Sequence, residues 1–311
     1  MQADAIVFET PMTMSLQSLA MAEMGESDVE VAVEYSGIST GTERLLWQGT
    51  MPAFPGMGYP LVPGYETVGR VLRAGSHATV AVGTRVFVPG SQCFKDARNL
   101  FGGAASRLVV PAARAMVIEE SLGERGVLFA LAATAYHATS RAGTRQPDLI
   151  VGHGVLGRMI ARLAVIAGGK PVVWETNPDR RAGAVGYDVI DPADDSGRRY
   201  DCICDVSGAA ALLDTLIARL APGGEIVLAG FYDTLSFNFA PAFMREARIR
   251  IAAQWAPDDL AAVIALAGDG RLSLDGLITH RDEVSHADTA YRTAFGDADC
   301  LKMILDWRSS Q

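Results

Sequence analysis

The sequence predicts an α/β protein in which a β-rich domain carries an inserted domain built on a doubly wound parallel sheet. Residues 1–118 alternate apolar and polar positions over short runs divided by glycine and proline, which is typical of strands in a barrel or sandwich. From Asp148 strand-like and helix-like segments alternate, as in a parallel sheet with helices on both faces. Residues 272–311 are again strand-like and short-helical, so we expect them to return to the first domain.

The elements follow from the local patterns in chain order. The strands expected in the first domain are 29–37, 67–75, 83–90 and 106–118. Residues 122–143 form a helix-like stretch, and Arg145 to Pro147 mark a break. The inserted domain then reads, in alternation, 148–152, 155–169, 171–175, 177–184, 201–208, 211–224 and 225–230. A strand-like ITHR, a short helix at 287–295 and a strand-like CLKMILDW complete the chain. The predicted domains are therefore 1–143 with 272–311, and 144–271.

Composition excludes several classes of protein. With 311 residues, a net charge of -9 and no run of lysine or arginine, the chain is not expected to bind nucleic acid. Its four cysteines form no CxxC pair, which favours a reducing, cytoplasmic setting. The N-terminus lacks the features of a signal peptide, and no apolar segment is long enough to span a bilayer.

A nucleotide-binding signature opens the inserted domain. Gly152, Gly154 and Gly157 have GxGxxG spacing, directly after an apolar strand and at the start of a helix that begins with Val155 and Leu156. Such glycines permit a tight turn and let the backbone approach a pyrophosphate at the positive end of the helix. We therefore expect the three glycines, Val155 and Leu156 to contact the cofactor. The context predicts a Rossmann domain, whereas the spacing alone would be weak evidence.

Glu175 bears on the choice of cofactor. It ends the second strand of this domain, where a carboxylate can accept hydrogen bonds from the adenosine ribose. A phosphate on that ribose would be repelled by about 4 kcal/mol at roughly 4 Å and an effective dielectric of about 20, so NAD is favoured over NADP. Arg180 and Arg181 could soften this repulsion, which makes Arg180 a cofactor candidate, or they could simply face solvent or the adenine. Ser207, Gly208, Gly230 and Phe231 follow later strands and are further cofactor candidates, unless they only pack in loops.

The order of the motifs GISTGTE, PGYE and GHGVLG resembles that of the medium-chain dehydrogenase/reductase superfamily. The resemblance implies a GroES-like substrate domain and a Rossmann domain for a nicotinamide cofactor, with Thr134 near the nicotinamide unless it only packs in its helix. Zinc-dependent members have ligands near the positions of Ser39, Tyr65 and Ala130. Because these residues are poor zinc ligands, we expect no metal.

Longer stretches resemble one zinc-free group within the superfamily, the bacteriochlorophyllide dehydrogenases. They are residues 36–66, 101–111 and 213–232. The resemblance implies NAD-dependent oxidation of a hydroxyethyl side chain on a bacteriochlorin, a tetrapyrrole, to an acetyl group. From Trp47 to Tyr65 the chain carries no charge, which suits a large, flat, apolar ligand. The candidate substrate contacts are Trp47, Met51, Phe54, Met57 and Tyr59, which could instead cover the end of the barrel or a subunit interface.

Without zinc, hydrogen bonds must orient the alcohol and stabilise the developing alkoxide. By family position the candidates are Ser39, Thr40, Thr42, Tyr65 and Glu66. Tyr65 is the first choice as a hydrogen-bond donor or proton acceptor, although it could merely fill the volume left by the metal. Glu66 could relay protons or pair with Arg44 or Arg70. We expect His137 to be a satisfied helix histidine and His153 to touch phosphate.

Two other functions fit the same sequence. One is a zinc-free quinone or enone reductase, which NADPH use would favour and Glu175 opposes. The other is a catalytically silent nucleotide-binding protein that has lost activity with its ligands. The segment FNFAPAFMREARIRIAAQW (237–255) could supply the sheet edge of a homodimer.

Overall fold

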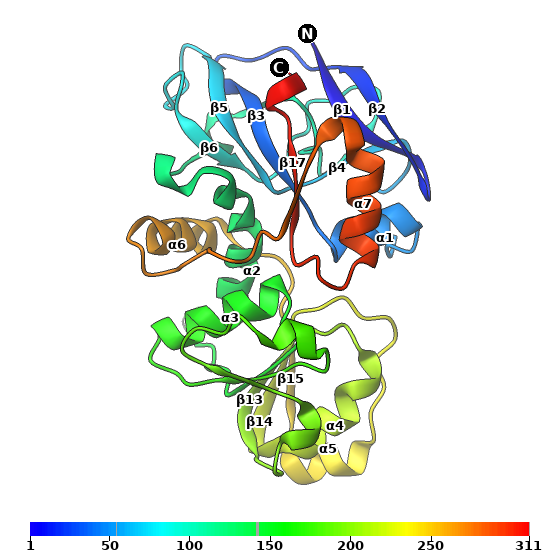
Figure 1. Cartoon of the computed structure of the whole chain (residues 1–311), viewed down its shortest axis with the longest axis vertical. Coiled ribbons are helices and arrows are strands. Elements are labelled where there is room, and N and C mark those ends of the chain that lie inside the picture. The colour runs from blue at the N-terminus through cyan, green and yellow to red at the C-terminus, as the bar shows by residue number, and fades with distance from the viewer. Residues whose placement is uncertain (54, 141–142, 311) are drawn as a thin grey trace. The chain divides into compact units, whose positions relative to one another are not determined.

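The structure is a computed structural model that describes residues 1–53, 55–140 and 143–310. The chain divides into two compact units, one made of Met1–Ala130 with Leu274–Gln311 and the other of Leu131–Ser273. The first is β-rich and the second contains a parallel sheet with helices (Figure 1). The α/β fold class predicted from the sequence is therefore confirmed.

Two sheets form the first unit. The smaller has the strand order β2-β1-β4-β7, and the larger has β16-β17-β3-β5-β6-β9 with β8 also paired to β3. The strands are β1 (Gln2–Thr10), β2 (Thr13–Ala20), β3 (Asp28–Ile38), β4 (Leu61–Pro63), β5 (Thr67–Ala74), β6 (Arg85–Val88), β7 (Arg98–Leu100), β8 (Arg107–Pro111), β9 (Met116–Val117), β16 (His280–Glu283) and β17 (Met303–Asp306). All four stretches predicted to be strands contain one, and residues 106–118 contain two, β8 and β9, separated by the 3₁₀ helix η1 (Ala112–Arg114).

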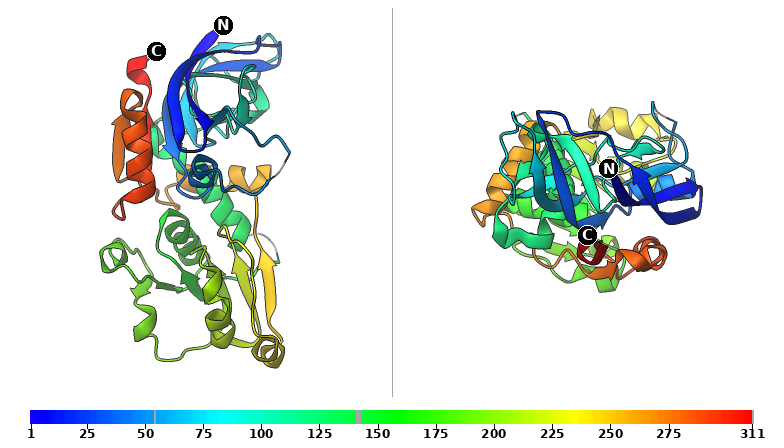
Figure 2. Two further views of the ribbon diagram at one scale, coloured as in Figure 1. Left: turned by 90° about the vertical axis from the view of Figure 1, so that its right-hand side faces the viewer. Right: turned by 90° about the horizontal axis from the view of Figure 1, so that it is seen from above.

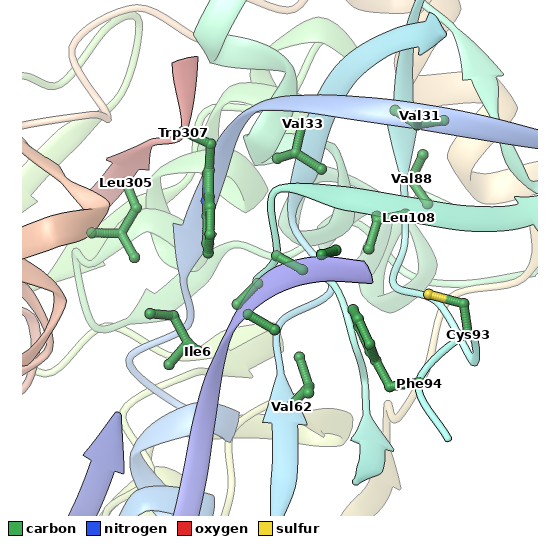
Figure 3. Close-up of a cluster of buried hydrophobic side chains, with 14 of the residues drawn as sticks. Ile6, Val31, Val33, Val62, Val88, Cys93, Phe94, Leu108, Leu305 and Trp307 are labelled. Atoms are coloured by element: carbon green, nitrogen blue, oxygen red, sulfur yellow. The ribbon is translucent and has the colours of Figure 1, made fainter. Parts of the chain in front are cut away.

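A large apolar core lies between the two sheets of this unit. Figure 3 shows Ile6 and Val62 from the smaller sheet gathered with Val33 and Leu108 from the larger one. Trp307 lies in the same core, fully buried, and its indole Nε1 donates a hydrogen bond to Ser36 Oγ at 2.8 Å. Because alternate residues of β3 are β-branched and face inward, this strand supplies the centre of the core.

The end of the chain completes the same unit. Strand β17 pairs antiparallel with β3, with Met303 opposite Ile38, and parallel with β16. Helix α7 (Ala287–Gly296) packs against both of these C-terminal strands (Figure 1). Both chain ends consequently belong to the β-rich unit, as Figure 2 shows.

Six parallel strands form the sheet of the second unit, in the order β12-β11-β10-β13-β14-β15. They are β10 (Leu149–Val151), β11 (Val172–Trp174), β12 (Asp188–Ile190), β13 (Tyr200–Asp205), β14 (Leu220–Leu228) and β15 (Arg248–Ile251). Numbered within the unit this is the order 3-2-1-4-5-6, in which the chain reverses direction across the sheet between β10 and β13. Ligands of such sheets bind at the carboxyl ends of the strands on either side of that reversal.

The helices differ from the sequence prediction in three places. Of the predicted helix-like stretch 211–224, residues 220–224 belong to β14. Residues 122–143 do not form one helix: the 3₁₀ helix η2 (Glu120–Leu128) has non-helical backbone at Gly123, and α2 (Phe129–Thr139) follows. Residues 177–184 contain only the 3₁₀ helix η3 (Pro178–Arg181). The remaining α-helices are α1 (Thr42–Gln48), α3 (Val155–Ile166), α4 (Leu213–Arg219), α5 (Phe239–Arg245) and α6 (Pro257–Gly268). The remaining 3₁₀ helices are η4 (Pro192–Asp194), η5 (Ala210–Leu212), η6 (Val284–His286) and η7 (Arg308–Ser310).

Candidate functional site

The three glycines after β10 have three different environments. Gly152 has φ +105°, a conformation that favours glycine. A Cβ on Gly157 would lie 1.9 Å from the Gly152 carbonyl oxygen, so only glycine lets α3 pack this closely on the turn. Gly154 is the N-cap of α3, and a Cβ there would meet no atom within 4 Å. The turn is thus tightly packed at Gly157 and open at Gly154.

The open side of this turn has the properties of an anion site. Helix α3 has twelve residues, and no side chain caps the N–H groups at its start. Unpaired N–H groups and the helix dipole favour a negatively charged group at that point. Val155 and Leu156, both predicted to contact the cofactor, form the first turn of α3. These residues fit the pyrophosphate of a dinucleotide.

The Glu175 carboxylate lies against the same turn. Its Oε2 accepts a hydrogen bond from the His153 backbone N–H at 3.0 Å, and its Oε1 accepts one from Asn177 N–H at 2.9 Å. Glu175 follows β11, which is the neighbour of β10 in the sheet. The structure therefore brings together the glycine turn and the acidic residue that the sequence analysis connected.

The His153 side chain does not point toward a phosphate position, contrary to our expectation. The ring is fully buried, with Nδ1 2.6 Å from the Arg180 carbonyl oxygen and Nε2 2.9 Å from Tyr187 Oη. Because a carbonyl can only accept, Nδ1 carries the proton and Nε2 accepts from Tyr187. Burial lowers the pKa of His153 to about 4, so the ring is neutral at physiological pH and acts as a structural support of the turn.

Other predicted cofactor residues lie at the ends of β13 and β14. Ser207 N–H donates to the buried Asp205 carboxylate at 2.9 Å, and Gly208 has φ +71°. A Cβ on Gly152 would lie 3.6 Å from Ser207 Cα, so this turn adjoins the glycine turn across the reversal point. A Cβ on Gly230 would lie 3.1 Å from Gly208 N, which places the two later turns side by side. Phe231 is 52% exposed beside them.

The basic residues after β11 have structural contacts. The Arg181 guanidinium donates to the carbonyl oxygens of Glu175 and Thr176 and pairs with Asp191. The Arg180 carbonyl accepts hydrogen bonds from His153 and from Arg158 Nη2.

Thr134 is partly buried in α2. His137 is hydrogen-bonded to Asp259 at 2.8 Å, as expected of a satisfied helix histidine.

In the β-rich unit, three predicted catalytic residues form one hydrogen-bonded group. Tyr65 Oη lies 2.7 Å from Ser39 Oγ and 3.2 Å from Thr42 Oγ1. Ser39 follows β3, Thr42 begins α1, and Tyr65 lies between β4 and β5. Thr40, the fourth hydroxyl candidate, is exposed and lies outside this group. We call Ser39, Thr42 and Tyr65 the hydroxyl cluster.

Tyr65 is held in its protonated form. Burial, followed by the negative charge of the neighbouring Glu66, raises the pKa of its phenol well above the usual value. Its ring packs edge-on against Phe101, with centroids 5.5 Å apart. A phenol held in this form is a hydrogen-bond donor rather than a base, and the role of Tyr65 stays a prediction.

Glu66 pairs with a residue that the sequence analysis did not identify. Lys302 Nζ lies 3.0 and 2.7 Å from the two Glu66 carboxylate oxygens, and both side chains are fully buried. The prediction that Glu66 pairs with Arg44 or Arg70 is wrong. Arg70 pairs with Glu34 and Glu120, and Arg44 is exposed. Since 236 residues separate Lys302 from Glu66, no local pattern could have revealed the pair.

A second buried carboxylate, Glu43, was also missed. It accepts hydrogen bonds from Ser39 N–H at 3.1 Å and from Tyr291 Oη at 2.7 Å. Burial raises the pKa of Glu43 to about 7. Its position within GISTGTE was the only signal available, and the contact with Tyr291 crosses 248 residues of sequence.

The predicted substrate residues are divided between core and surface. Trp47 is buried at 4% exposure and packs edge-on against Phe8, while Met51, Met57 and Tyr59 are partly buried against the same core. Tyr59 Oη donates a hydrogen bond to the Leu46 carbonyl oxygen. Phe54 lies outside the described residues. A role in substrate binding therefore stays a prediction for this segment.

The residues that correspond to zinc ligands offer no strong donor set. Ser39 and Tyr65 bond to each other, Ala130 is fully buried, and Glu66 is occupied by Lys302. Within residues 1–53, 55–140 and 143–310, no three histidine, cysteine, aspartate or glutamate side chains are arranged to hold a metal ion.

No helix in those ranges is long and apolar enough to cross a membrane.

Comparison with known proteins identifies the family. Residues 25–120 match the alcohol dehydrogenase GroES-like domain. Over the full length of both chains, the sequence is 54% identical to the 2-desacetyl-2-hydroxyethyl bacteriochlorophyllide A dehydrogenase of Rhodobacter capsulatus and 55% identical to that of Cereibacter sphaeroides. The chain belongs to this family of dehydrogenases. It is accordingly an oxidoreductase of the alcohol dehydrogenase type, within the medium-chain dehydrogenase/reductase superfamily.

Solved structures confirm the fold predicted for this family member. An Escherichia coli alcohol dehydrogenase in complex with NADH superposes with a TM-score of 0.84 at 21% identity, covering 98% of this chain and 99% of that one. A dehydrogenase structure from Sinorhizobium meliloti, bound to NADP, gives a TM-score of 0.83 at 22% identity, with the same coverage. At these identities the likeness concerns the fold, a GroES-like domain with an inserted Rossmann domain.

Proposed function

We propose that the chain oxidises the hydroxyethyl side chain of a bacteriochlorophyllide to an acetyl group in bacteriochlorophyll biosynthesis, using NAD and no metal ion. The observation that carries the proposal is the Ser39–Tyr65 hydroxyl pair, found where zinc-dependent relatives have ligands, in a chain more than half identical to enzymes named for this substrate. The reaction breaks one C–H and one O–H bond and forms a C=O bond. A bound nicotinamide ring would accept the hydride.

The second unit supports a nicotinamide dinucleotide, and NAD in particular. The open space at Gly154 and the uncapped start of α3 fit a pyrophosphate. Glu175 places a carboxylate beside the same turn, where it would accept hydrogen bonds from ribose hydroxyls and repel a ribose phosphate. Arg181 is occupied by Asp191 and by backbone carbonyls, which limits its use as a phosphate ligand.

The hydroxyl cluster supports the chemistry at the alcohol. Because Tyr65 stays protonated, we propose that its Oη–H donates to the substrate oxygen as negative charge develops there. Ser39 Oγ–H can then donate to Tyr65 Oη, and two hydrogen bonds in series strengthen each other. The proton leaving the alcohol would pass to solvent or to a group outside this cluster.

Turnover with and without metal tests the proposal. Purified protein treated with chelator, and assayed for metal content, should reduce NAD when given 2-desacetyl-2-hydroxyethyl bacteriochlorophyllide A. Tyr65→Phe keeps the ring and its contact with Phe101 but removes the donor, so kcat should fall about 100-fold. Activity that depends on added zinc would overturn the metal-free mechanism. Tight NADH binding without turnover would favour a silent nucleotide-binding protein.

We also propose that two copies pair through the edge of the parallel sheet. Strand β15 is the last strand in the sheet order, and Ile251 on it is 70% exposed. Helix α5, just before it, exposes Phe239, Phe243 and Met244. An exposed apolar strand edge of this kind is generally protected by a partner.

A further inference from the structure

Lys302 is unusual among the charged residues of the chain. The sequence has three lysines, and whereas Lys95 and Lys170 are exposed, Lys302 is 1% exposed. Lysine is almost never fully buried unless its charge is paired. Lys302 Nζ donates hydrogen bonds to the Ile38 carbonyl oxygen at 3.0 Å and to the two Glu66 carboxylate oxygens at 3.0 and 2.7 Å.

These contacts join the two segments that carry the hydroxyl pair. Ile38 directly precedes Ser39 at the end of β3, and Glu66 directly follows Tyr65 before β5. The Ser39–Tyr65 hydrogen bond is 2.7 Å long and depends on the spacing of those segments. Lys302 itself is fixed by the chain return, because its carbonyl accepts hydrogen bonds from Thr279 and His280 N–H.

Gly37 shows that the chain is shaped around this pair. A Cβ on Gly37 would lie 2.2 Å from Glu66 Oε2, so the carboxylate reaches Lys302 only because residue 37 has no side chain. The Gly37 N–H also donates to the Glu66 carbonyl oxygen at 2.8 Å. Sterics and charge therefore hold Glu66 against the end of β3.

We infer that Lys302 is a positioning residue, which ties Ile38 to Glu66 and so holds the hydroxyls of Ser39 and Tyr65 in the geometry needed to bind the substrate oxygen. The inference rests on the proposed function of Tyr65 as a donor. Lys302 is buried and bonded to Ile38 and Glu66, so it would not itself touch the substrate. Its effect reaches the reaction only through the placement of Tyr65 and Ser39.

A double-mutant cycle tests this inference. Lys302→Met alone would leave the Glu66 charge buried without a partner and risks unfolding, so the test variant is Lys302→Met with Glu66→Gln, which is neutral. We call this double substitution the clamp variant. The cycle compares the clamp variant, Tyr65→Phe, and the protein that carries all three substitutions, with Lys170→Met at an exposed lysine as the matched control. The measurements are kcat, KM, NADH affinity, thermal midpoint and the Ser39 Oγ–Tyr65 Oη separation in a crystal structure.

Expected results distinguish positioning from a merely structural role. The clamp variant should fold and bind NADH as the wild type does, lose at least tenfold in kcat with little change in KM, and cost little further in the Tyr65→Phe background. Equal losses in both backgrounds, or an unchanged rate and separation, would overturn the inference. If the wild type fails to oxidise the substrate, the proposed function fails, and the separation in the crystal structure still decides whether Lys302 positions the pair.

Discussion

A Cβ on Gly157 would lie 1.9 Å from the carbonyl oxygen of Gly152, whereas one on Gly154, two residues after Gly152, would meet open space. The two glycines at the start of α3 therefore have different roles, one in packing and one in leaving room for a ligand. Gly157 lets α3 lie against the turn, and Gly154 leaves room at the point where the helix N–H groups face outward.

Alanine at these two glycines should give opposite results. Gly157→Ala must displace the turn and should lower the free energy of unfolding by at least about 2 kcal/mol. Gly154→Ala, at φ -74°, should change it by less than about 0.5 kcal/mol, yet weaken NADH binding because the methyl group occupies the approach to the pyrophosphate. Urea unfolding and NADH titration measure the two effects. Unchanged NADH affinity in a folded Gly154→Ala protein would contradict this placement of the cofactor.

Removing the charge of Glu175 should relax the preference for NAD. Glu175→Gln keeps the size of the side chain but removes the carboxylate that would repel a ribose phosphate. The ratio of the Kd for NADP to that for NAD should fall at least about tenfold, which corresponds to about 1.4 kcal/mol, and fluorescence titration with both cofactors measures it.

The matched control for that change is Asp179→Asn. Asp179 is an exposed carboxylate four residues further along, and its substitution removes the same charge from the loop but not from the strand end. It should leave the cofactor ratio unchanged. Equal effects of the two substitutions would mean that only the overall charge of this region matters, and an unaltered ratio in Glu175→Gln would place the ribose elsewhere.

The sequence identified the parts of the site that depend on local spacing. Strand β10, the three glycines and Glu175 lie within 27 residues, 149–175, and their pattern alone connects them. Helix 122–143 was predicted too long because its apolar content hid the break at Gly123, where the backbone is non-helical. The three-residue strands β4 and β7 were missed because they are too short for an alternation to be recognised.

The environment of the hydroxyl cluster could not be predicted in the same way. Ser39 and Tyr65 were chosen by family position, but what surrounds them comes from the C-terminal return of the chain. Lys302 and Tyr291 reach Glu66 and Glu43 across more than 200 residues, and each pairing depends on β17 or α7 lying beside β3 and α1. Hydrophobic periodicity in the sequence shows which face of a strand or helix is buried, but it does not show which distant side chain contacts that face.

The buried carboxyl of Glu43 should make stability depend on pH. Its pKa is raised to about 7 in the folded protein from about 4.5, so the folded state binds more protons than the unfolded state between these values. The stabilisation is complete below about pH 4.5 and is lost as the pH rises toward 7, by about 3 kcal/mol in total. Tyr291 stays protonated in this range because burial and Glu43 raise its pKa.

Comparison with Glu43→Gln isolates that contribution. Glutamine has nearly the same shape and does not titrate, so the free energy of unfolding of the wild type should fall relative to that of the variant as the pH rises from 5 to 8. Urea unfolding at four pH values measures it. The charges of Glu66 and Lys302 are present in both proteins and cancel in the difference. Parallel pH profiles would show that Glu43 is ionised throughout and that its hydrogen bonds outweigh burial.

Charge on the exposed edge strand should break the proposed homodimer. Ile251 on β15 is 70% exposed, and a glutamate there would have to be buried without a partner if two edges meet. The wild type should have a mass near twice 33.0 kDa by light scattering, and Ile251→Glu should have the mass of one chain. Val185→Glu, at a site 65% exposed in the same unit but away from β15 in the sheet order, should remain dimeric. A monomeric wild type would exclude the dimer, and a dimeric Ile251→Glu would move its interface to another surface, because a buried unpaired carboxylate costs more than one edge contact can offset.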